Sequence, residues 1–296
     1  MATHFYKDNQ QAWFHDEGHT SGFFHTYDSL QLGETAPRKV HIFLPRDYET
    51  QTQRYPVVYV NDGNTAFFRG GLANKSWWMA EVLEGLYRHN EICPLILVAI
   101  HPLNRDVEYT HAPVFHRPSG VEAYGNYVSH FVKPFVDRNY RTLPHRERTT
   151  ILGSSHGGLA AFYIACRHCD RFGNAAALSP SFWVGLDTGV GMFFPLSKSK
   201  LIQITAPTLQ NRQNRPKIWL DWGLLRHNGF HNWFIERHAT KRGREMAELL
   251  QKKFNYVLNR DLFVWEDENG EHTEDAWSRR LPFVFKAFYF KSDRVA

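Results

Sequence analysis

The sequence predicts an α/β fold in which a mostly parallel central sheet is flanked by helices. Three observations lead to this prediction: short apolar runs recur along the chain, several of them are apolar on both faces, and helical patterns alternate with them. A strand that is apolar on both faces belongs to a sheet covered by helices on each side. Regular alternation of strand and helix is typical of a parallel sheet, because parallel strands need a crossover connection.

The individual elements follow from these patterns in chain order. Residues 1–35 contain no clear helical pattern and are expected to form an antiparallel edge hairpin. Strands are expected at 39–44, 56–61, 94–100, 149–152, 174–178, 217–222 and 262–265. Helices are expected at 76–90, 121–139, 157–168, 240–255 and 274–290, the last interrupted at Pro282. Residues 185–215, rich in Gly, Pro, Ser, Gln and Asn, are expected to form a long loop insertion within one domain that spans 1–296.

The composition is ordinary for a soluble globular protein, with 43% apolar and 22% charged residues. The net charge of +5 comes from basic residues scattered among acids, so no nucleic-acid partner is expected. Neither an N-terminal apolar signal nor an apolar span of about 18 residues is present, so no membrane partner is expected. Cys93, Cys166 and Cys169 cannot all pair internally, and these features together predict a cytoplasmic protein.

Residues 148–166 carry the most informative motif of the chain. An apolar strand run is followed by Gly153-Ser154-Ser155-His156-Gly157 and then by a helical pattern, which is the signature of a nucleophile elbow. So tight a turn forces the serine into a strained, positive-φ conformation, and glycines at 153 and 157 leave room for it. The helix N-terminus that follows provides unpaired N–H groups beside the hydroxyl. Ser155 is therefore the predicted nucleophile.

A serine nucleophile needs a base within hydrogen-bond reach, usually a histidine held by a carboxylate. In folds with a nucleophile elbow, the chain order is serine, acid, histidine. His272 follows the last expected strand and the turn 266–270, and it precedes a helix that begins near 273–275. This position predicts His272 as the base.

Four segments of the chain resemble one family. They are 55–63 (YPVVYVNDG), 151–158 (ILGSSHGG), 178–183 (LSPSFW) and 271–282 (EHTEDAWSRRLP), and the family is the one named Putative esterase among the α/β-hydrolases. It includes enterochelin-type siderophore esterases, S-formylglutathione hydrolases, feruloyl esterases and mycolyltransferases. The resemblance covers residues 38–290. It implies an α/β-hydrolase fold, Ser155 as nucleophile, His272 as base and no cofactor.

The chain departs from the family at the orienting carboxylate. Related esterases place Glu or Asp about three residues beyond the glycine that ends the strand at 217–222, and that count from Gly223 reaches Arg226, which cannot accept the histidine N–H. Residues 223–238 are expected to form an enlarged loop, and Glu236 is the first carboxylate beyond the strand. Glu236 is the predicted acid, with Asp221, another carboxylate or a Ser–His dyad as alternatives.

The oxyanion hole is expected to use the backbone N–H of His156, which follows the nucleophile, and a second N–H from the loop after the 56–61 strand. The resemblance implies that Asn64 supplies this second donor; a plain Asp-Gly turn is the alternative. Phe68, Trp183 and Trp233 follow site-forming strands and are candidates for a substrate pocket, although most aromatic residues belong to the core. An anionic substrate group could meet Arg69, Arg105 or Arg117.

Two histidine pairs and one cysteine pair have spacings that suggest other chemistry. His227 and His231, and His15 and His19, are four residues apart, but a glycine between the members of each pair argues against a stable metal-binding helix. No metal site is predicted. Cys166 and Cys169 lie near the end of a helical pattern, where no helix N-terminus lowers a thiol pKa, so structural thiols are favoured over a redox pair.

The sequence therefore predicts a serine esterase that cleaves a small-molecule carboxylic ester through an acyl-enzyme. Acyl transfer to another alcohol would use the same residues and differs only in whether the site excludes water. A non-catalytic binding protein that retains the fold is the alternative from another class, because a fold does not by itself imply a function. The sequence makes no prediction of substrate identity or oligomeric state.

Overall fold

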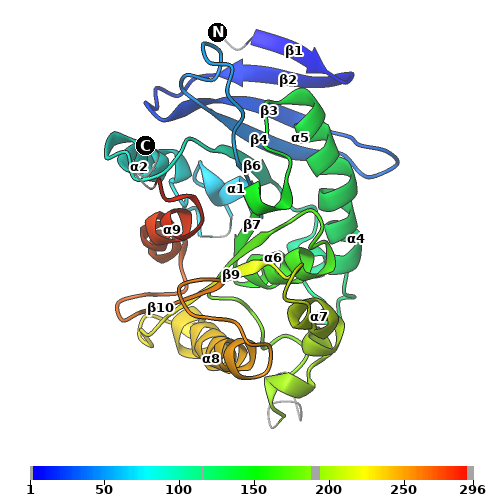
Figure 1. Ribbon diagram of the computed structural model, residues 1–296, viewed down its shortest axis with the longest axis vertical. Coiled ribbons are helices and arrows are strands. Elements are labelled where there is room, and N and C mark those ends of the chain that lie inside the picture. Colours follow the sequence, from blue (N-terminus) through cyan, green and yellow to red (C-terminus); the bar gives the residue numbers. More distant parts are fainter. Residues whose placement is uncertain (1–2, 72, 115, 188–193, 292–296) are drawn as a thin grey trace.

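The computed structural model describes residues 3–71, 73–114, 116–187 and 194–291. Within these residues the strands form one ten-stranded sheet in the order β1-β2-β3-β4-β6-β5-β7-β8-β9-β10 (Figure 1). The strands are β1 (Thr3–Lys7), β2 (Gln10–His15), β3 (Gly22–Leu30), β4 (Arg38–Pro45), β5 (Val57–Val60), β6 (Ile96–Ile100), β7 (Thr149–Ser154), β8 (Asn174–Leu178), β9 (Lys217–Gly223) and β10 (Leu262–Asp267).

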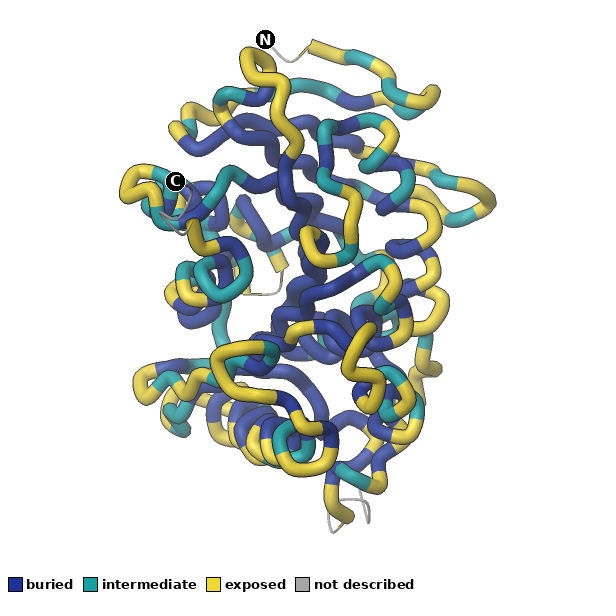
Figure 2. The backbone as a smooth tube through the Cα atoms, in the orientation of Figure 1, coloured by how far each residue is buried: buried dark blue, intermediate teal, exposed yellow. Residues whose placement is uncertain are grey.

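The sheet has a parallel part and an antiparallel part. The neighbouring pairs from β6 through β5, β7, β8 and β9 to β10 are all parallel. The pairs that join β1, β2, β3, β4 and β6 are antiparallel. The predicted α/β fold with a mostly parallel sheet is confirmed, and the first residues form an antiparallel edge, as expected. All of β5, β6, β7 and β8 is buried, which explains why these strands are apolar on both faces (Figure 2).

Helices cover both faces of the sheet. The apolar side chains of α2 (Met79–Arg88) and α9 (Glu274–Tyr289) pack in the core on one face. The core on the other face receives side chains from α4 (Val121–Tyr127), α5 (Lys133–Asn139), α6 (His156–Arg167), α7 (Lys200–Gln210) and α8 (Arg237–Lys252) (Figure 1). Two short helices, α1 (Gly63–Ala66) and α3 (Arg105–Glu108), follow β5 and β6. A π-helical turn (Val128–Val132) joins α4 to α5, so that 121–139 is helical throughout.

The prediction of one long loop at 185–215 is wrong over its second half. A 3₁₀ turn (Leu196–Lys198) and helix α7 lie there, while residues 188–193 fall outside the described part of the chain. The Ser199 hydroxyl accepts a hydrogen bond from the N–H of Ile202 and caps α7. Many Gln, Asn, Thr and Pro residues surround the buried stripe of this helix. The composition therefore favoured a loop, although the segment forms the helical crossover between β8 and β9.

Two further boundaries differ from the expectation. Helix α9 continues through Pro282, because Leu281, Val284 and Phe285 are all buried against the core and hold the two halves together. The expected loop at 223–238 is irregular only up to residue 229; a π-helical turn (His231–Glu236) then leads directly into α8. No helix in the described ranges is both long enough and apolar enough to cross a membrane.

Candidate functional site

Ser155 lies at the turn between β7 and α6, at the carboxyl edge of the parallel strands. Its φ of 54° and ψ of −122° place it in a conformation that L-residues rarely adopt. A Cβ at residue 153 would collide with the carbonyl of Gly157, and a Cβ at residue 157 would lie 2.9 Å from a carboxylate oxygen of Asp62. Both positions therefore require glycine, because neighbouring atoms lie too close to leave room for a Cβ, as the motif predicts.

Gly153→Ala is expected to destabilise the fold by roughly 1–3 kcal/mol, because the added methyl overlaps backbone atoms that cannot move aside. Urea unfolding followed by circular dichroism measures this change. Gly85→Ala in α2 is the matched control, since a Cβ there meets nothing within 4 Å. That variant should gain about 0.5–1 kcal/mol from helix propensity. Equal stability of the two variants would contradict the steric account.

The three residues expected to cooperate lie together in the structure. The Nε2 atom of His272 is 2.9 Å from the Ser155 hydroxyl, and its Nδ1 atom contacts the carboxylate Oε2 of Glu236. His272 comes from the loop between β10 and α9, and Glu236 ends the π-helical turn before α8. All three side chains are buried or nearly so. One imidazole thus bridges a hydroxyl and a carboxylate, which is the geometry required for transfer of a proton from the serine.

Glu236 is fixed by further hydrogen bonds. Its Oε1 atom accepts from the backbone N–H of Gly223 and from the Ser179 hydroxyl at 2.9 Å. Burial opposes the charged form, but the hydrogen bond with His272 and neighbouring positive charge outweigh it, so the pKa of Glu236 lies below its usual value. The carboxylate is therefore ionised at neutral pH and acts as an acceptor for the imidazole N–H.

Asp221, the alternative acid, is engaged elsewhere. Its carboxylate accepts hydrogen bonds from Arg280 at 2.5 Å and from the Trp219 indole at 2.7 Å. Burial raises the pKa of Asp221 to about 6, in spite of the adjacent guanidinium. Arg226, three residues beyond Gly223, donates to the carbonyl of Gly223 and to the Thr240 hydroxyl.

Asn232 is a residue of the site that the sequence did not reveal. Its side-chain oxygen accepts a 2.8 Å hydrogen bond from the backbone N–H of His272, and its amide nitrogen donates to the carbonyl of His227. Asn232 and Glu236 are four residues apart on one helical turn, so both can face the same loop. Because the composition of the segment gave no helical signal, this shared face was not apparent from the sequence.

The two expected oxyanion donors lie in the first turns of two helices. His156 is the first residue of α6, and Asn64 is the second residue of α1. The first N–H groups of a helix have no partner within the helix and are free to bind an anion. The side-chain amide of Asn61 joins the two turns by donating a 2.8 Å hydrogen bond to the carbonyl of Gly157.

Arg105 also links these turns. Its guanidinium lies 2.8 and 3.2 Å from the two carboxylate oxygens of Asp62 and 3.4 Å from the carbonyl of Ser154. Its charge is therefore balanced within the protein rather than left for an anionic substrate. Arg117 pairs with Asp106, and the guanidinium of Arg69 lies 5.5 Å from the centre of the Trp78 ring.

The three candidate pocket residues occupy different surroundings. Trp183 is buried, and its ring centre lies 5.8 Å from that of His156, the residue after Ser155. Phe68 packs against the core aromatics of the antiparallel strands, with its ring centre 5.3 Å from that of Phe24. Trp233 is 57% exposed on the π-helical turn that carries Glu236. Of the three, Trp183 is the one that contacts a residue of the elbow through a ring interaction.

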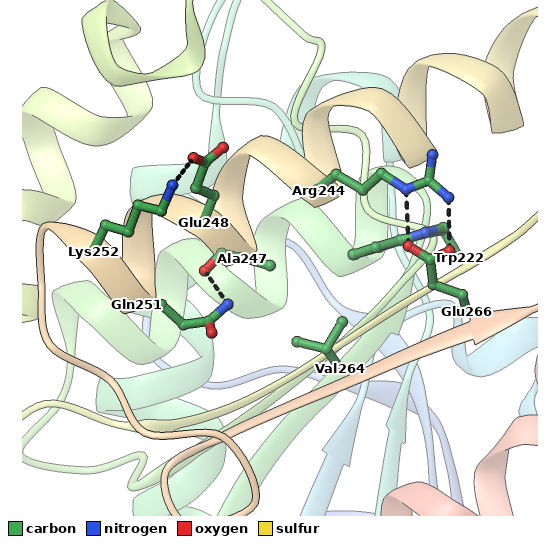
Figure 3. Close-up of a pocket in the computed structure, with 8 residues that line it drawn as sticks. All are labelled: Trp222, Arg244, Ala247, Glu248, Gln251, Lys252, Val264 and Glu266. Carbon is green, nitrogen blue, oxygen red and sulfur yellow. Dashed lines mark hydrogen bonds and ion pairs between the residues drawn. The ribbon is translucent and has the colours of Figure 1, made fainter.

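In the described ranges, no group of three or more His, Cys, Asp or Glu side chains is arranged to hold a metal ion. His15 instead forms hydrogen bonds with Glu17 and Thr26. The ring of His231 stacks on that of His272, with 6.2 Å between the ring centres. The cysteines are free thiols, and burial raises the pKa of Cys166 well above its usual value. A hollow of about 220 Å³ lies between α8 and β10 (Figure 3), and Ser155, His272 and Glu236 are not among the residues that line it. Its charged side chains pair with one another, Arg244 with Glu266 and Lys252 with Glu248.

The fold places this protein in the class of α/β-hydrolases, and a serine, a histidine and a glutamate lie together at the carboxyl edge of its sheet. A family model described as Putative esterase matches residues 34–288, and the chain belongs to that family.

Individual relatives are more distant. Uncharacterized protein YbbA of Bacillus subtilis (strain 168) is 25% identical over 162 residues, which cover 52% of this chain and 61% of the relative. Siderophore hydrolase EstB from Aspergillus nidulans superposes with a TM-score of 0.66 at 18% identity, covering 93% of this chain and 96% of that one. The enterobactin esterase FES from Shigella flexneri superposes with a TM-score of 0.59 at 16% identity, covering 90% of this chain and 58% of that one. The chain thus spans less than two thirds of the lengths of YbbA and FES, and the two structural matches show a shared fold.

Proposed function

We propose that this protein is a serine esterase that hydrolyses a small-molecule carboxylic ester through an acyl-enzyme. The observation that carries the proposal is the continuous set of contacts from the Ser155 hydroxyl through His272 to Glu236. Membership of an esterase family supports the reaction class. Two structurally similar proteins are named as an enterobactin esterase and a siderophore hydrolase, which supports a small ester substrate here as well.

In the proposed mechanism, Ser155 attacks the ester carbonyl carbon while Nε2 of His272 accepts the hydroxyl proton. Glu236 stabilises the imidazolium that forms. The oxyanion of the tetrahedral intermediate accepts hydrogen bonds from the backbone N–H groups of His156 and Asn64. The C–O bond to the leaving alcohol then breaks, and His272 protonates that alcohol. Water repeats the sequence on the acyl-serine and releases the carboxylic acid.

The direct test is hydrolysis of p-nitrophenyl acetate combined with a fluorophosphonate probe, which reacts quickly only with an activated serine. Turnover together with a probe adduct on the peptide that contains Ser155 is the expected result. Added acceptor alcohols separate hydrolysis from acyl transfer, because a transferase would convert them into new esters. Absence of both turnover and labelling would favour the non-catalytic alternative.

Arg105→Met is expected to lower kcat by about 10- to 100-fold, because it leaves the Asp62 carboxylate uncompensated beside the turns that hold the oxyanion. Steady-state kinetics with p-nitrophenyl acetate measures this effect. Adding Asp62→Asn should restore part of the loss, since the negative charge is then removed as well. Arg117→Met is the control, because its ion pair with Asp106 is exposed and contributes little. Equal activity of wild type and Arg105→Met would refute the role of this pair.

A further inference from the structure

A buried polar cluster lies next to Glu236 and contacts its Oε1 atom through Ser179. It consists of Ser179, Asp221, Trp277 and Arg280. Ser179 follows β8, Asp221 lies on β9, and Trp277 and Arg280 lie on α9. Ser179 and Asp221 are 0% exposed and Arg280 is 1% exposed, so water does not compete for their hydrogen bonds. The mechanism described so far does not use this cluster.

The contacts of the Ser179 hydroxyl fix the direction of its hydrogen. Its oxygen lies 3.2 Å from the indole nitrogen of Trp277 and 3.3 Å from both terminal nitrogens of Arg280. Indole and guanidinium nitrogens donate hydrogen bonds and do not accept them. The remaining neighbour that can accept is the Oε1 atom of Glu236, at 2.9 Å. The hydroxyl therefore accepts from α9 and donates to Glu236.

The guanidinium of Arg280 lies near several carboxylates, including Asp267, whose Oδ2 atom is 3.8 Å from Nε. It contacts Asp221 directly at 2.5 Å and reaches Glu236 through the Ser179 hydroxyl. The backbone N–H of Ser179 also donates to Asp221, at 3.2 Å, so one residue connects both acids. Hydrogen bonds in such a chain polarise one another, and the effect is larger in a dry interior. Through the Ser179 hydroxyl, the positive charge of Arg280 therefore strengthens the hydrogen bond that Glu236 accepts.

We propose that Ser179 is a positioning residue for the esterase reaction: its hydroxyl, held by Trp277 and Arg280, holds the Glu236 carboxylate in the orientation that faces His272. This inference rests on the function proposed above. With Oε1 occupied by Ser179 and Gly223, the Oε2 atom is left for the imidazole. The hydroxyl acts through Glu236 and does not touch the reacting atoms.

The test is Ser179→Ala, assayed with p-nitrophenyl acetate and with the fluorophosphonate probe. Loss of a hydrogen bond to a charged group is expected to lower the rate by about 10- to 100-fold. We expect kcat to fall in that range with KM unchanged, and the rate of Ser155 labelling to fall by the same factor. Ser21→Ala is the matched control: it also removes a buried hydroxyl that donates a hydrogen bond, here to the carbonyl of Ala80, but far from the site. It should leave both rates unchanged.

Trp277→Phe is the second variant, for the case in which Ser179→Ala does not fold. It keeps an aromatic ring beside His272 but removes the indole N–H that helps to orient the hydroxyl. We expect kcat about fivefold lower at unchanged KM, the effect of losing one hydrogen bond. Unchanged kcat in a folded Ser179→Ala or Trp277→Phe variant would overturn the inference while leaving the esterase assignment intact. A wild-type protein that neither hydrolyses esters nor reacts with the probe would overturn both.

Discussion

Ser155→Ala is expected to lower kcat for p-nitrophenyl acetate by roughly four to six orders of magnitude, as loss of a nucleophile does in other serine hydrolases. The variant keeps the oxyanion donors and His272 but has no oxygen to form the acyl-enzyme. Binding groups remain in place, so KM should change far less than kcat. Steady-state kinetics with enough enzyme to detect residual turnover measures this difference.

Ser154→Ala is the control for this substitution. Both serines belong to the same motif, both are buried, and they are adjacent in the chain. In the structure, the hydroxyl of Ser155 faces His272, whereas Ser154 takes part in the site through its backbone carbonyl, which accepts a hydrogen bond from Arg105. Ser154→Ala should therefore keep kcat within about threefold. Comparable losses in the two variants, or a Ser155→Ala enzyme as active as wild type, would remove Ser155 from the mechanism.

Glu236→Gln should lower kcat by about 10³- to 10⁴-fold with the fold preserved. The amide has nearly the same shape, but it carries no negative charge to stabilise the imidazolium of His272 and favours the wrong histidine tautomer. The corresponding change in another serine hydrolase lowers kcat by about 10⁴-fold. Kinetics with p-nitrophenyl acetate gives the loss, and thermal unfolding shows whether the variant remains folded.

Asp221→Asn distinguishes the two carboxylates that the sequence left open. Asp221 bonds to Arg280 and Trp219 rather than to His272, so its amide variant should lose less than about tenfold in kcat. The two substitutions are matched, because each replaces a fully buried carboxylate by its amide. A larger loss for Asp221→Asn than for Glu236→Gln would reverse the assignment of the acid. Small losses in both would favour a Ser–His dyad.

Local patterns predicted most of the fold. The strands from β4 to β10 were expected within three residues of their observed bounds, because the apolar period of a strand is set by its own residues. The expectation was wrong at α7 and at Pro282. In both places, burial against a neighbouring layer outweighed a local preference for loop or helix end. Local sequence does not report such packing.

By itself, the sequence determined the elbow and the position of Ser155 in it, because strand, glycines, serine and helix are contiguous and their steric demands are local. The sequence also predicted His272 as the base, because this residue follows the last expected strand. For the partner of that histidine, the sequence predicted Glu236 but left Asp221, another carboxylate and a dyad open, and only the tertiary structure brings Glu236 to His272. Glu236 and Asp221 are both buried near the end of the parallel sheet, and only the π-helical turn before α8 and the cluster around Ser179 direct one toward His272 and the other toward Arg280. Which carboxylate meets the imidazole depends on side-chain directions set by packing between distant segments, and no spacing along the chain encodes those directions.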